Sequence, residues 1–274
     1  MSGSPLEGRE DALSRLDITS AHSARVWNYL LGGKDHFAAD RETGDLILKM
    51  FPGIAALARL QRRFLVRAVR YLAGEAGIRQ FLDIGTGLPT ADNTHEVAQA
   101  IAPASRIVYA DNDPMVLIHA KVLLTSAPEG ATSYVEADVR DPDTILEKAA
   151  HALDLSRPVA LVMLGIMGQL PDSDDPHALA RRYLDALPSG SYLALCDGTT
   201  VSPALNEAIA AYNQNSASSY HLRTLEQIGA FFDGLTMVPP GIVPVSQWRS
   251  DAEETPSKDS GGKDATGCGI GFKQ

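Results

Sequence analysis

The segment 80–90, with the sequence QFLDIGTGLPT, brings an acidic residue and two glycines to the end of an apolar run. The pattern predicts a buried strand that ends near Asp83 and leads into a turn through Gly85, Thr86 and Gly87. Glycine permits backbone angles that other residues avoid, and it lets a ligand come into contact with the main chain. A carboxylate beside that turn would repel the pyrophosphate of a dinucleotide, whereas it suits a ligand that carries positive charge.

Two further strand-like runs end in acids: residues 106–111 end at Asp111, and residues 132–137 are followed by Asp138. Nucleotide-binding sheets place a carboxylate for the ribose diol about twenty residues after the glycine turn, which is the position of Asp111. An acid at the next strand end can accept the adenine amino hydrogens. Each acid alone is equally compatible with a helix N-cap or a turn. Three in succession indicate one adenosyl ligand with a cationic centre, S-adenosylmethionine.

Strands and helices alternate after residue 77, which predicts an α/β fold with a parallel sheet covered on both faces. Such sheets bind ligands beyond the carboxyl ends of their strands, where the winding changes direction. The predicted strands are 80–84, 106–111, 132–137, 159–164 and 191–196, with a closing hairpin at 235–245 and 267–273. The residues expected to bind the cofactor are Asp83, Gly85, Thr86, Gly87, Asp111, Asn112, Asp138, Val139, Leu164 and Gly33.

The chain divides by composition into three parts. Residues 1–17 are polar, which predicts a mobile N-terminus. Residues 18–76 predict a helical extension that breaks at Gly32-Gly33 and at Pro52-Gly53, and residues 77–274 predict the cofactor-binding domain. Within that domain, residues 250–267 are rich in Ser, Gly, Asp and Lys, which predicts an exposed loop.

The segment 29–37, YLLGGKDHF, places two glycines beside aromatic and ionisable groups and could fold over a bound cofactor as a lid. In that case Tyr29 or Phe37 would face the sulfonium as a cation–π partner. Asp35 or His36 would then take a proton from the methyl acceptor. The alternative is a helix hairpin that is broken by glycines and whose charged residues pair in water.

Bulk properties limit the possible partners. The formal net charge of the 274 residues is -10, which disfavours nucleic acid because phosphates are bound through lysine and arginine. We therefore expect a small-molecule acceptor. Residues 1–15 lack a secretory signal, no apolar run is long enough to span a membrane, and the histidines and two cysteines form no metal-binding pattern. These features predict a cytoplasmic protein with no membrane partner and no metal, and they leave its oligomeric state open.

Several blocks of the sequence resemble class I S-adenosylmethionine-dependent methyltransferases. Within that class they resemble a bacterial family first catalogued as a domain of unknown function. The resemblance covers nearly the whole chain and implies a Rossmann-like sheet of seven strands, mostly parallel, with an antiparallel last strand. It also implies the cofactor S-adenosylmethionine and methyl transfer, without naming the acceptor. The blocks that carry it are ARVWNYLLGGKD at 24–35, GIRQFLDIG at 77–85, LPT at 88–90, NTHE at 93–96 and DNDP at 111–114.

The sequence thus favours a methyltransferase that acts on a small molecule. Two alternatives remain open, because similar sheets support many chemistries. One is an NAD-dependent oxidoreductase, and the other is a regulator that binds S-adenosylmethionine without catalysis. Calorimetry with S-adenosylmethionine and with NAD distinguishes the methyltransferase from the NAD-dependent oxidoreductase. Tight cofactor binding without a methylated product would indicate the second.

Overall fold

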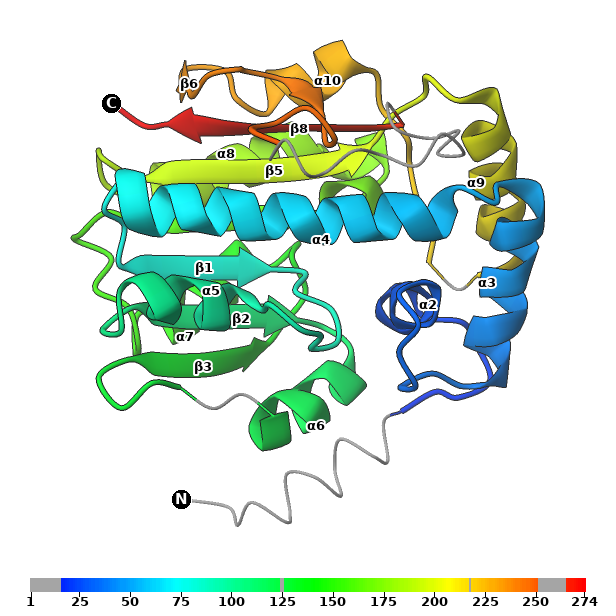
Figure 1. Cartoon of the computed structure of the whole chain (residues 1–274), viewed down its shortest axis with the longest axis horizontal. Coiled ribbons are helices and arrows are strands. Elements are labelled where there is room, and N and C mark those ends of the chain that lie inside the picture. Colours follow the sequence, from blue (N-terminus) through cyan, green and yellow to red (C-terminus); the bar gives the residue numbers. More distant parts are fainter. Residues whose placement is uncertain (1–15, 124–125, 217, 251–264) are drawn as a thin grey trace.

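The computed structural model describes residues 16–123, 126–216, 218–250 and 265–274. Its centre is a sheet in which the strand order is β3-β2-β1-β4-β5-β8-β6, with the short β7 also paired to β8 (Figure 1). Neighbours from β3 to β5 are parallel, whereas β8 is antiparallel to β5. The strands are β1 Gln80–Ile84, β2 Arg106–Asp111, β3 Ala131–Glu136, β4 Ala160–Leu164, β5 Tyr192–Gly198, β6 Thr236–Met237, β7 Val243–Pro244 and β8 Thr266–Phe272.

The expected sheet is therefore confirmed, including its antiparallel last strand. The seventh position is shared by two short strands, because β6 pairs with Gly271 and Phe272 of β8 while β7 pairs with Gly267 and Cys268. The predicted mobile N-terminus and exposed loop lie almost entirely outside the described residues. The division of the chain at residue 76 stays a prediction.

Helices cover both faces of the sheet. In Figure 1, α4 and α5 lie in front of the strands and α7 and α8 lie behind them. The helical elements are α2 Ser23–Leu30, α3 Ala38–Met50, α4 Ile54–Arg70, the π-helical turn η1 Tyr71–Glu75, α5 Thr94–Ile101, α6 Pro114–Leu123, α7 Pro142–Ala149, the short turns η2 Met167–Gln169 and η3 Asp172–Asp174, α8 Pro176–Asp185, α9 Pro203–Asn215 and α10 Leu225–Ala230.

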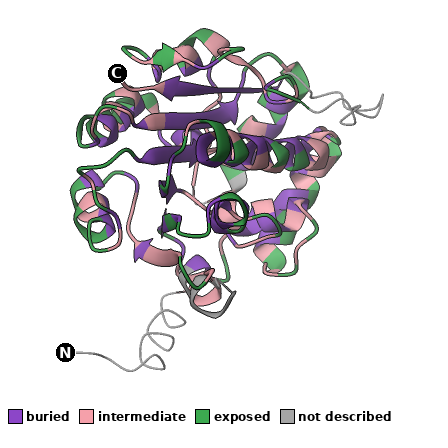
Figure 2. Cartoon of the chain, turned by 60° about the vertical axis from the view of Figure 1, so that its left-hand side comes forward, coloured by how far each residue is buried: buried purple, intermediate pink, exposed green. Residues whose placement is uncertain are grey.

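The middle strands β1, β4 and β5 are buried on both sides and mainly purple in Figure 2, whereas the edge strand β3 is mostly of intermediate exposure. Successive side chains of a strand point to opposite faces. Phe81 of β1 accordingly packs in the core under α4 and α5, while Leu82 packs in the core under α7 and α8. This double burial explains why the central strands read as apolar runs rather than as an alternating pattern.

The helix α4 connects the N-terminal segment to the sheet. Its residues Phe64 and Ala68 belong to the same core cluster as β1, β4 and β5. Arg67 is buried on this face and donates to the carbonyl oxygens of Trp248 at 2.8 Å and Val245 at 2.7 Å. The N-terminal helices and the sheet therefore share one hydrophobic core.

Three helices stand over the carboxyl ends of the parallel strands. In Figure 1 the arrowheads of β1, β2 and β3 point toward α2, α3 and α9, which form that side of the molecule. The helix α3 packs against both α2 and α9. No helix in the described part of the chain is long and apolar enough to cross a membrane.

Candidate active site

A cavity of about 260 Å³ lies between the carboxyl ends of the strands and the helices α2, α4 and α9. Nine of the ten residues expected to bind the cofactor line it: Asp83, Gly85, Thr86, Gly87, Asp111, Asn112, Asp138, Val139 and Leu164. They come from four strand ends that are far apart in the sequence. The parallel sheet brings them together because the carboxyl ends of its strands share one edge.

The glycine turn after β1 adopts the expected backbone geometry. Gly85 and Gly87 have φ angles of 71° and 66°, in the left-handed region that favours glycine. A Cβ on Gly85 would lie 2.6 Å from the side chain of Ile166, whereas a Cβ on Gly87 would meet nothing within 4 Å. Gly85 is thus required for packing, and Gly87 presents its main chain to open space.

Asp83 is the carboxylate at the end of β1. It is 6% exposed, and its Oδ2 accepts a hydrogen bond of 2.6 Å from the hydroxyl of Thr94. Burial raises the pKa of Asp83 to about 6, although the Thr94 hydrogen bond and the positive charge of Arg62 oppose that shift. Arg62 also lines the cavity, so the part of the cavity next to β1 holds one carboxyl group and one positively charged guanidinium.

Asp111 joins the second strand to the glycine turn. Its Oδ2 accepts from the amide of Gly87 at 2.8 Å, and its Oδ1 accepts from the amide of Asp113 at 3.0 Å. Burial raises the pKa of Asp111, and the two amide hydrogen bonds oppose that rise. A carboxylate has about four lone-pair positions, so two remain for a ligand.

Asp138 lies at the third strand end and is more exposed. Its Oδ2 accepts from the side-chain amide of Asn112 at 3.1 Å. Its Oδ1 accepts from the backbone amide of Arg140 at 2.8 Å, and the Arg140 side chain bridges Asp138 and Asp174. Neighbouring Val139 is buried beside it. These contacts fix the position of the acid at the rim of the cavity.

The helix α2 is held by ion pairs to α3 and to the loop that follows β2. Nδ1 of His22 lies 3.0 Å from Oδ2 of Asp113, while Arg25 lies 3.3 Å from Asp40 and 3.8 Å from the same Asp113 oxygen. Burial alone would lower the pKa of His22, but the hydrogen bond and charge of Asp113 raise it above the usual value. These contacts hold α2 over the cavity.

The remaining predicted residues lie outside the cavity lining. The Tyr29 hydroxyl donates to Asp45 at 2.5 Å, and the Tyr29 ring packs edge-on against His36 at 5.1 Å between ring centres. The Nε2 atom of His36 lies 3.1 Å from the Gly33 carbonyl oxygen, and Asp35 lies 3.6 Å from His119. None of Tyr29, Gly33, Asp35 and His36 lines the cavity, although the backbone amides of Gly33 and Asp35 donate to Asn28, which does. Their predicted roles therefore gain no support from this arrangement.

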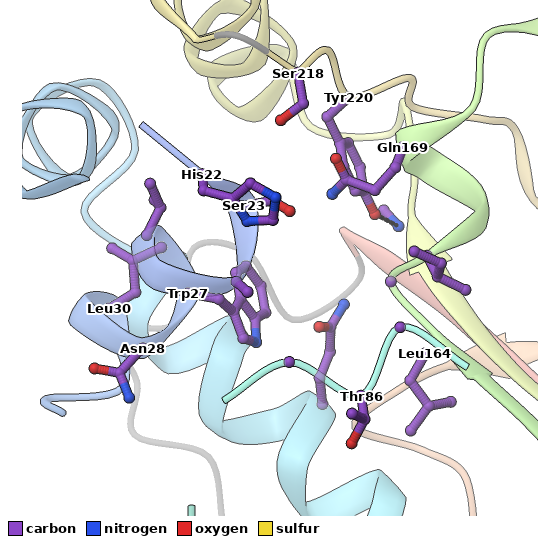
Figure 3. A pocket seen from close by; sticks show the side chains of 18 of the residues that line it. His22, Ser23, Trp27, Asn28, Leu30, Thr86, Leu164, Gln169, Ser218 and Tyr220 are labelled. Carbon is purple, nitrogen blue, oxygen red and sulfur yellow. Dashed lines mark hydrogen bonds between the residues drawn. The ribbon is translucent and has the colours of Figure 1, made fainter. Parts of the chain in front are cut away.

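Other lining residues were not predicted from the sequence. Trp27 and His22 reach the cavity from the α2 side, and Gln169 and Tyr220 lie opposite them (Figure 3). Helical geometry offered one signal, since positions 27 and 29 point about 200° apart and cannot both face the same ligand. Gln169 and Tyr220 belong to no recognisable sequence motif.

The strand order with an antiparallel β8, together with an acid-lined cavity at the carboxyl edge, defines a class I S-adenosylmethionine-dependent methyltransferase. Residues 9–274 match the family model described as S-adenosyl methyltransferase. The chain belongs to this family. It is therefore an S-adenosylmethionine-dependent methyltransferase, and the comparisons give no support to the oxidoreductase or regulator alternatives.

Two solved structures are similar over the whole fold. A DUF574 family protein from Streptomyces avermitilis is 45% identical with a TM-score of 0.91, and the match covers 95% of this chain and 100% of that one. A putative methyltransferase from Thermobifida fusca is 40% identical with a TM-score of 0.86, with 100% of both chains covered. An O-methyltransferase family protein from Burkholderia thailandensis shares the fold alone, at 14% identity and a TM-score of 0.53 over 81% of this chain and 58% of that one. No curated protein matches the chain.

Proposed function

We propose that this cavity binds S-adenosylmethionine through the three strand-end carboxylates and that the enzyme methylates a small molecule. The observation that carries the proposal is that Asp83, Asp111 and Asp138 line one cavity together with the glycine turn. When bound, the cofactor supplies an activated methyl group attached to a positively charged sulfur. The protein has to orient the two reactants and exclude water.

The donor set fits this cofactor. Asp83 suits the ammonium group, and Arg62 beside it suits the carboxylate of the methionine part. Asp111 retains lone pairs for the ribose hydroxyls after accepting from two backbone amides. The open space at Gly87 allows the ligand to approach the main chain. Asp138 and Val139 also line the cavity and are the groups that we propose for the adenine ring.

Two features favour a small acceptor over a macromolecule. The helices α2, α3 and α9 stand over the carboxyl edge of the sheet (Figure 1), and residues of all three line the cavity. The formal charge of -10 disfavours nucleic acid as the acceptor.

Trp27 is the aromatic residue that we propose for the sulfonium of the cofactor. It lies in the cavity wall near the glycine turn, where its ring can face a sulfonium.

Calorimetry on the full chain tests the cofactor site. We expect S-adenosylmethionine to bind and NAD not to bind. Replacing Asp111 by Ala should raise the Kd for S-adenosylmethionine roughly tenfold to a hundredfold, because hydrogen bonds to a charged group contribute about 1.5–3 kcal/mol. Asp143→Asn serves as the control, since Asp143 is exposed on α7. Unchanged affinity in Asp111→Ala, or preferential binding of NAD, would refute the proposal.

A further inference from the structure

The side of the cavity next to α9 has lining residues that the cofactor site does not use. Its wall is mainly apolar and aromatic, and it comes from α9, from the segment that follows α9 and from the start of α4. The apolar members are Ile54, Leu57, Leu205, Ile209, Tyr212 and Leu222. Such a wall would bind an apolar body.

The polar end of this wall is a buried pair of side chains. The hydroxyl of Tyr220 donates to Oδ1 of Asp197 and accepts from the amide of Gly198 at 3.1 Å. Asp197 is 1% exposed, and its Oδ2 accepts from the amide of Gly168 at 3.1 Å. Tyr220 lines the cavity and Asp197 stands behind it. The pair is thus a tyrosine of the cavity wall whose hydroxyl donates to a buried carboxylate behind it.

The chain is built around this pair. A Cβ on Gly168 would lie 2.4 Å from the Tyr220 ring and 2.7 Å from Oδ1 of Asp197, so only glycine leaves room for the contact. The segment that carries Tyr220 is fixed next to β4, because Arg223 donates to the carbonyl oxygens of Met167 and Leu170 at 2.8 Å. The position of the Tyr220 hydroxyl is therefore set from two directions.

Gln169 supplies a second polar group beside Tyr220 (Figure 3). Its Oε1 is buried and, among the residues that the structure describes, finds no hydrogen-bond partner. Buried hydrogen-bond acceptors nearly always have a donor, so an acceptor without a partner in a cavity wall indicates a donor on the ligand. Gln169 lines the cavity, and its free oxygen would accept from an O–H or N–H of the acceptor.

The charges of the cavity favour a neutral acceptor. Each cationic residue of the described lining has a carboxylate close by. His22 contacts Asp113, Arg140 contacts Asp138 and Asp174, and the charge of Arg62 acts on Asp83. An anionic acceptor would have to compete with those carboxylates.

We propose that the α9 side of the cavity is the methyl-acceptor subsite and that it takes a neutral, largely apolar molecule with a phenolic or enolic hydroxyl and a second hydrogen-bond donor. The hydroxyl contacts Tyr220, and the second donor contacts Gln169. Tyr220 is then a catalytic residue and Asp197 a positioning residue behind it. This inference rests on the proposed function, because the methyl group must come from the cofactor site.

The proton transfer balances within these groups. The acceptor oxygen forms its new bond to the methyl carbon as the carbon–sulfur bond breaks, and that electron pair leaves with the sulfur. The acceptor proton passes to the Tyr220 oxygen, and the original Tyr220 proton passes to Asp197. Burial raises the pKa of Asp197 to about 6, against the opposing effects of Tyr220 and Arg223. Such a base is better matched to a phenol, with a pKa of about 10, than to an aliphatic alcohol.

Binding of 2,3-dihydroxynaphthalene to the full-length enzyme loaded with S-adenosylhomocysteine tests the subsite. We expect it to bind at least fivefold more tightly than 2-naphthol, which lacks the second donor, and more tightly than the anionic 3-hydroxy-2-naphthoate. In Gln169→Leu the difference between the two neutral compounds should disappear, because one hydrogen bond corresponds to roughly a fivefold to tenfold change in Kd. No binding, or the same preference in Gln169→Leu, would overturn the proposal.

Turnover of 2,3-dihydroxynaphthalene tests the proton path. Tyr220→Phe should lower kcat about a hundredfold or more, the usual size of a general-base effect, with little change in KM. Asp197→Asn should also lower kcat. Asp197→Glu should have a higher kcat than Asp197→Asn, which a purely structural role of Asp197 would not produce. Unchanged kcat in Tyr220→Phe would overturn the assignment even if Asp197→Asn failed to fold.

Cofactor calorimetry distinguishes failure of the proposed function from failure of the acceptor subsite. Wild-type enzyme that does not bind S-adenosylmethionine refutes the proposed function. Intact cofactor binding without binding of 2,3-dihydroxynaphthalene refutes only the acceptor subsite.

Discussion

His22 and Asp113 form an ion pair of 3.0 Å that connects the start of α2 to the residue two positions after Asp111. The helix over the cavity is thereby fixed to the same loop that carries the proposed ribose ligand. Stability and cofactor binding should both respond to this contact, because Asp113 also donates its backbone amide to Asp111 at 3.0 Å.

The pair should stabilise the fold within a limited pH range. The folded-state pKa of His22 is raised, so its contribution is complete below the unfolded value of about 6.5 and is lost as the pH rises through the folded value. Burial alone would raise the pKa of Asp113, but the hydrogen bond and charge of His22, the Met115 amide and the charge of Arg25 together lower it. The contribution of Asp113 is therefore present above about 3.9 and is lost on acidification through its lowered folded value. We expect His22→Gln to cost about 1–2 kcal/mol at pH 6 and less at pH 8.5.

Thermal unfolding of wild type and His22→Gln at both pH values measures this effect. The control is His151→Gln, which changes an exposed histidine away from the cavity. An equal loss of Tm at pH 6 and pH 8.5 would show that the His22 side chain acts through packing rather than charge.

Cofactor affinity should depend on the ionisation of Asp83. Burial places its pKa at about 6, so between pH 7 and pH 5 it changes from mostly ionised to mostly protonated. Below pH 7 the α-amino group of the cofactor stays positive. We therefore expect the Kd for S-adenosylmethionine to rise up to about tenfold as the pH falls from 7 to 5. Calorimetry on Asp83→Asn should give weaker binding and a smaller pH dependence. The same pH dependence in both proteins would assign the titration to other groups.

Trp27 and Tyr29 give a direct comparison between the two sides of α2. Trp27 lines the cavity, while Tyr29 contacts Asp45 and His36 outside it. Trp27→Leu should raise the Kd for S-adenosylmethionine roughly threefold to tenfold through loss of a cation–π contact. Tyr29→Phe should leave the Kd unchanged. The reverse result would restore Tyr29 as the aromatic partner of the sulfonium.

A base at His36 is tested separately by turnover. His36→Ala should retain the wild-type kcat. The ring nitrogens of His36 are hydrogen-bonded to Gly33 and Arg41, and His36 does not line the cavity. A loss of a hundredfold or more in kcat with unchanged cofactor affinity would instead support the catalytic role that the sequence suggested.

A methyl group at position 168 should disturb the acceptor side alone. Gly168→Ala would place its Cβ 2.4 Å from the Tyr220 ring and force that side chain away from Asp197. We expect kcat to fall at least tenfold while the Kd for S-adenosylmethionine stays within twofold. The matched control is Gly229→Ala in α10, where an added Cβ meets nothing within 4 Å. Equal effects of the two substitutions would argue against a role for the Tyr220 position.

Nine of the ten residues predicted for the cofactor line one cavity, because the sequence signals that pointed to them are local. The strands β1 and β2 have the bounds that their sequences predict, and each carries its acid near its carboxyl end, Asp83 inside β1 and Asp111 as the last residue of β2. Parallel pairing then brings Asp83, Asp111 and Asp138 to one edge without further information.

The acceptor side depends on contacts between distant segments, so no local pattern predicted it. The helix α9 was not predicted. Its buried residues Leu205, Ala208 and Tyr212 lie in the core shared with the N-terminal helices, and α9 itself packs on α3, more than 150 residues earlier. Likewise, the face of α2 that meets the cavity is decided by how the helix docks, which is why Trp27 rather than Tyr29 lies in the wall.

The strand order also has a consequence for how enzymes of this kind can diversify. The carboxylates proposed for the cofactor lie at the carboxyl ends of β1, β2 and β3. The groups proposed for the acceptor lie at or after the ends of β4 and β5, on the other side of the point where the winding reverses. Exchanging the segment from α9 to Tyr220 could therefore alter which compound is modified while the methyl donor and its affinity stay the same. That segment is the natural target for redirecting the enzyme to new substrates.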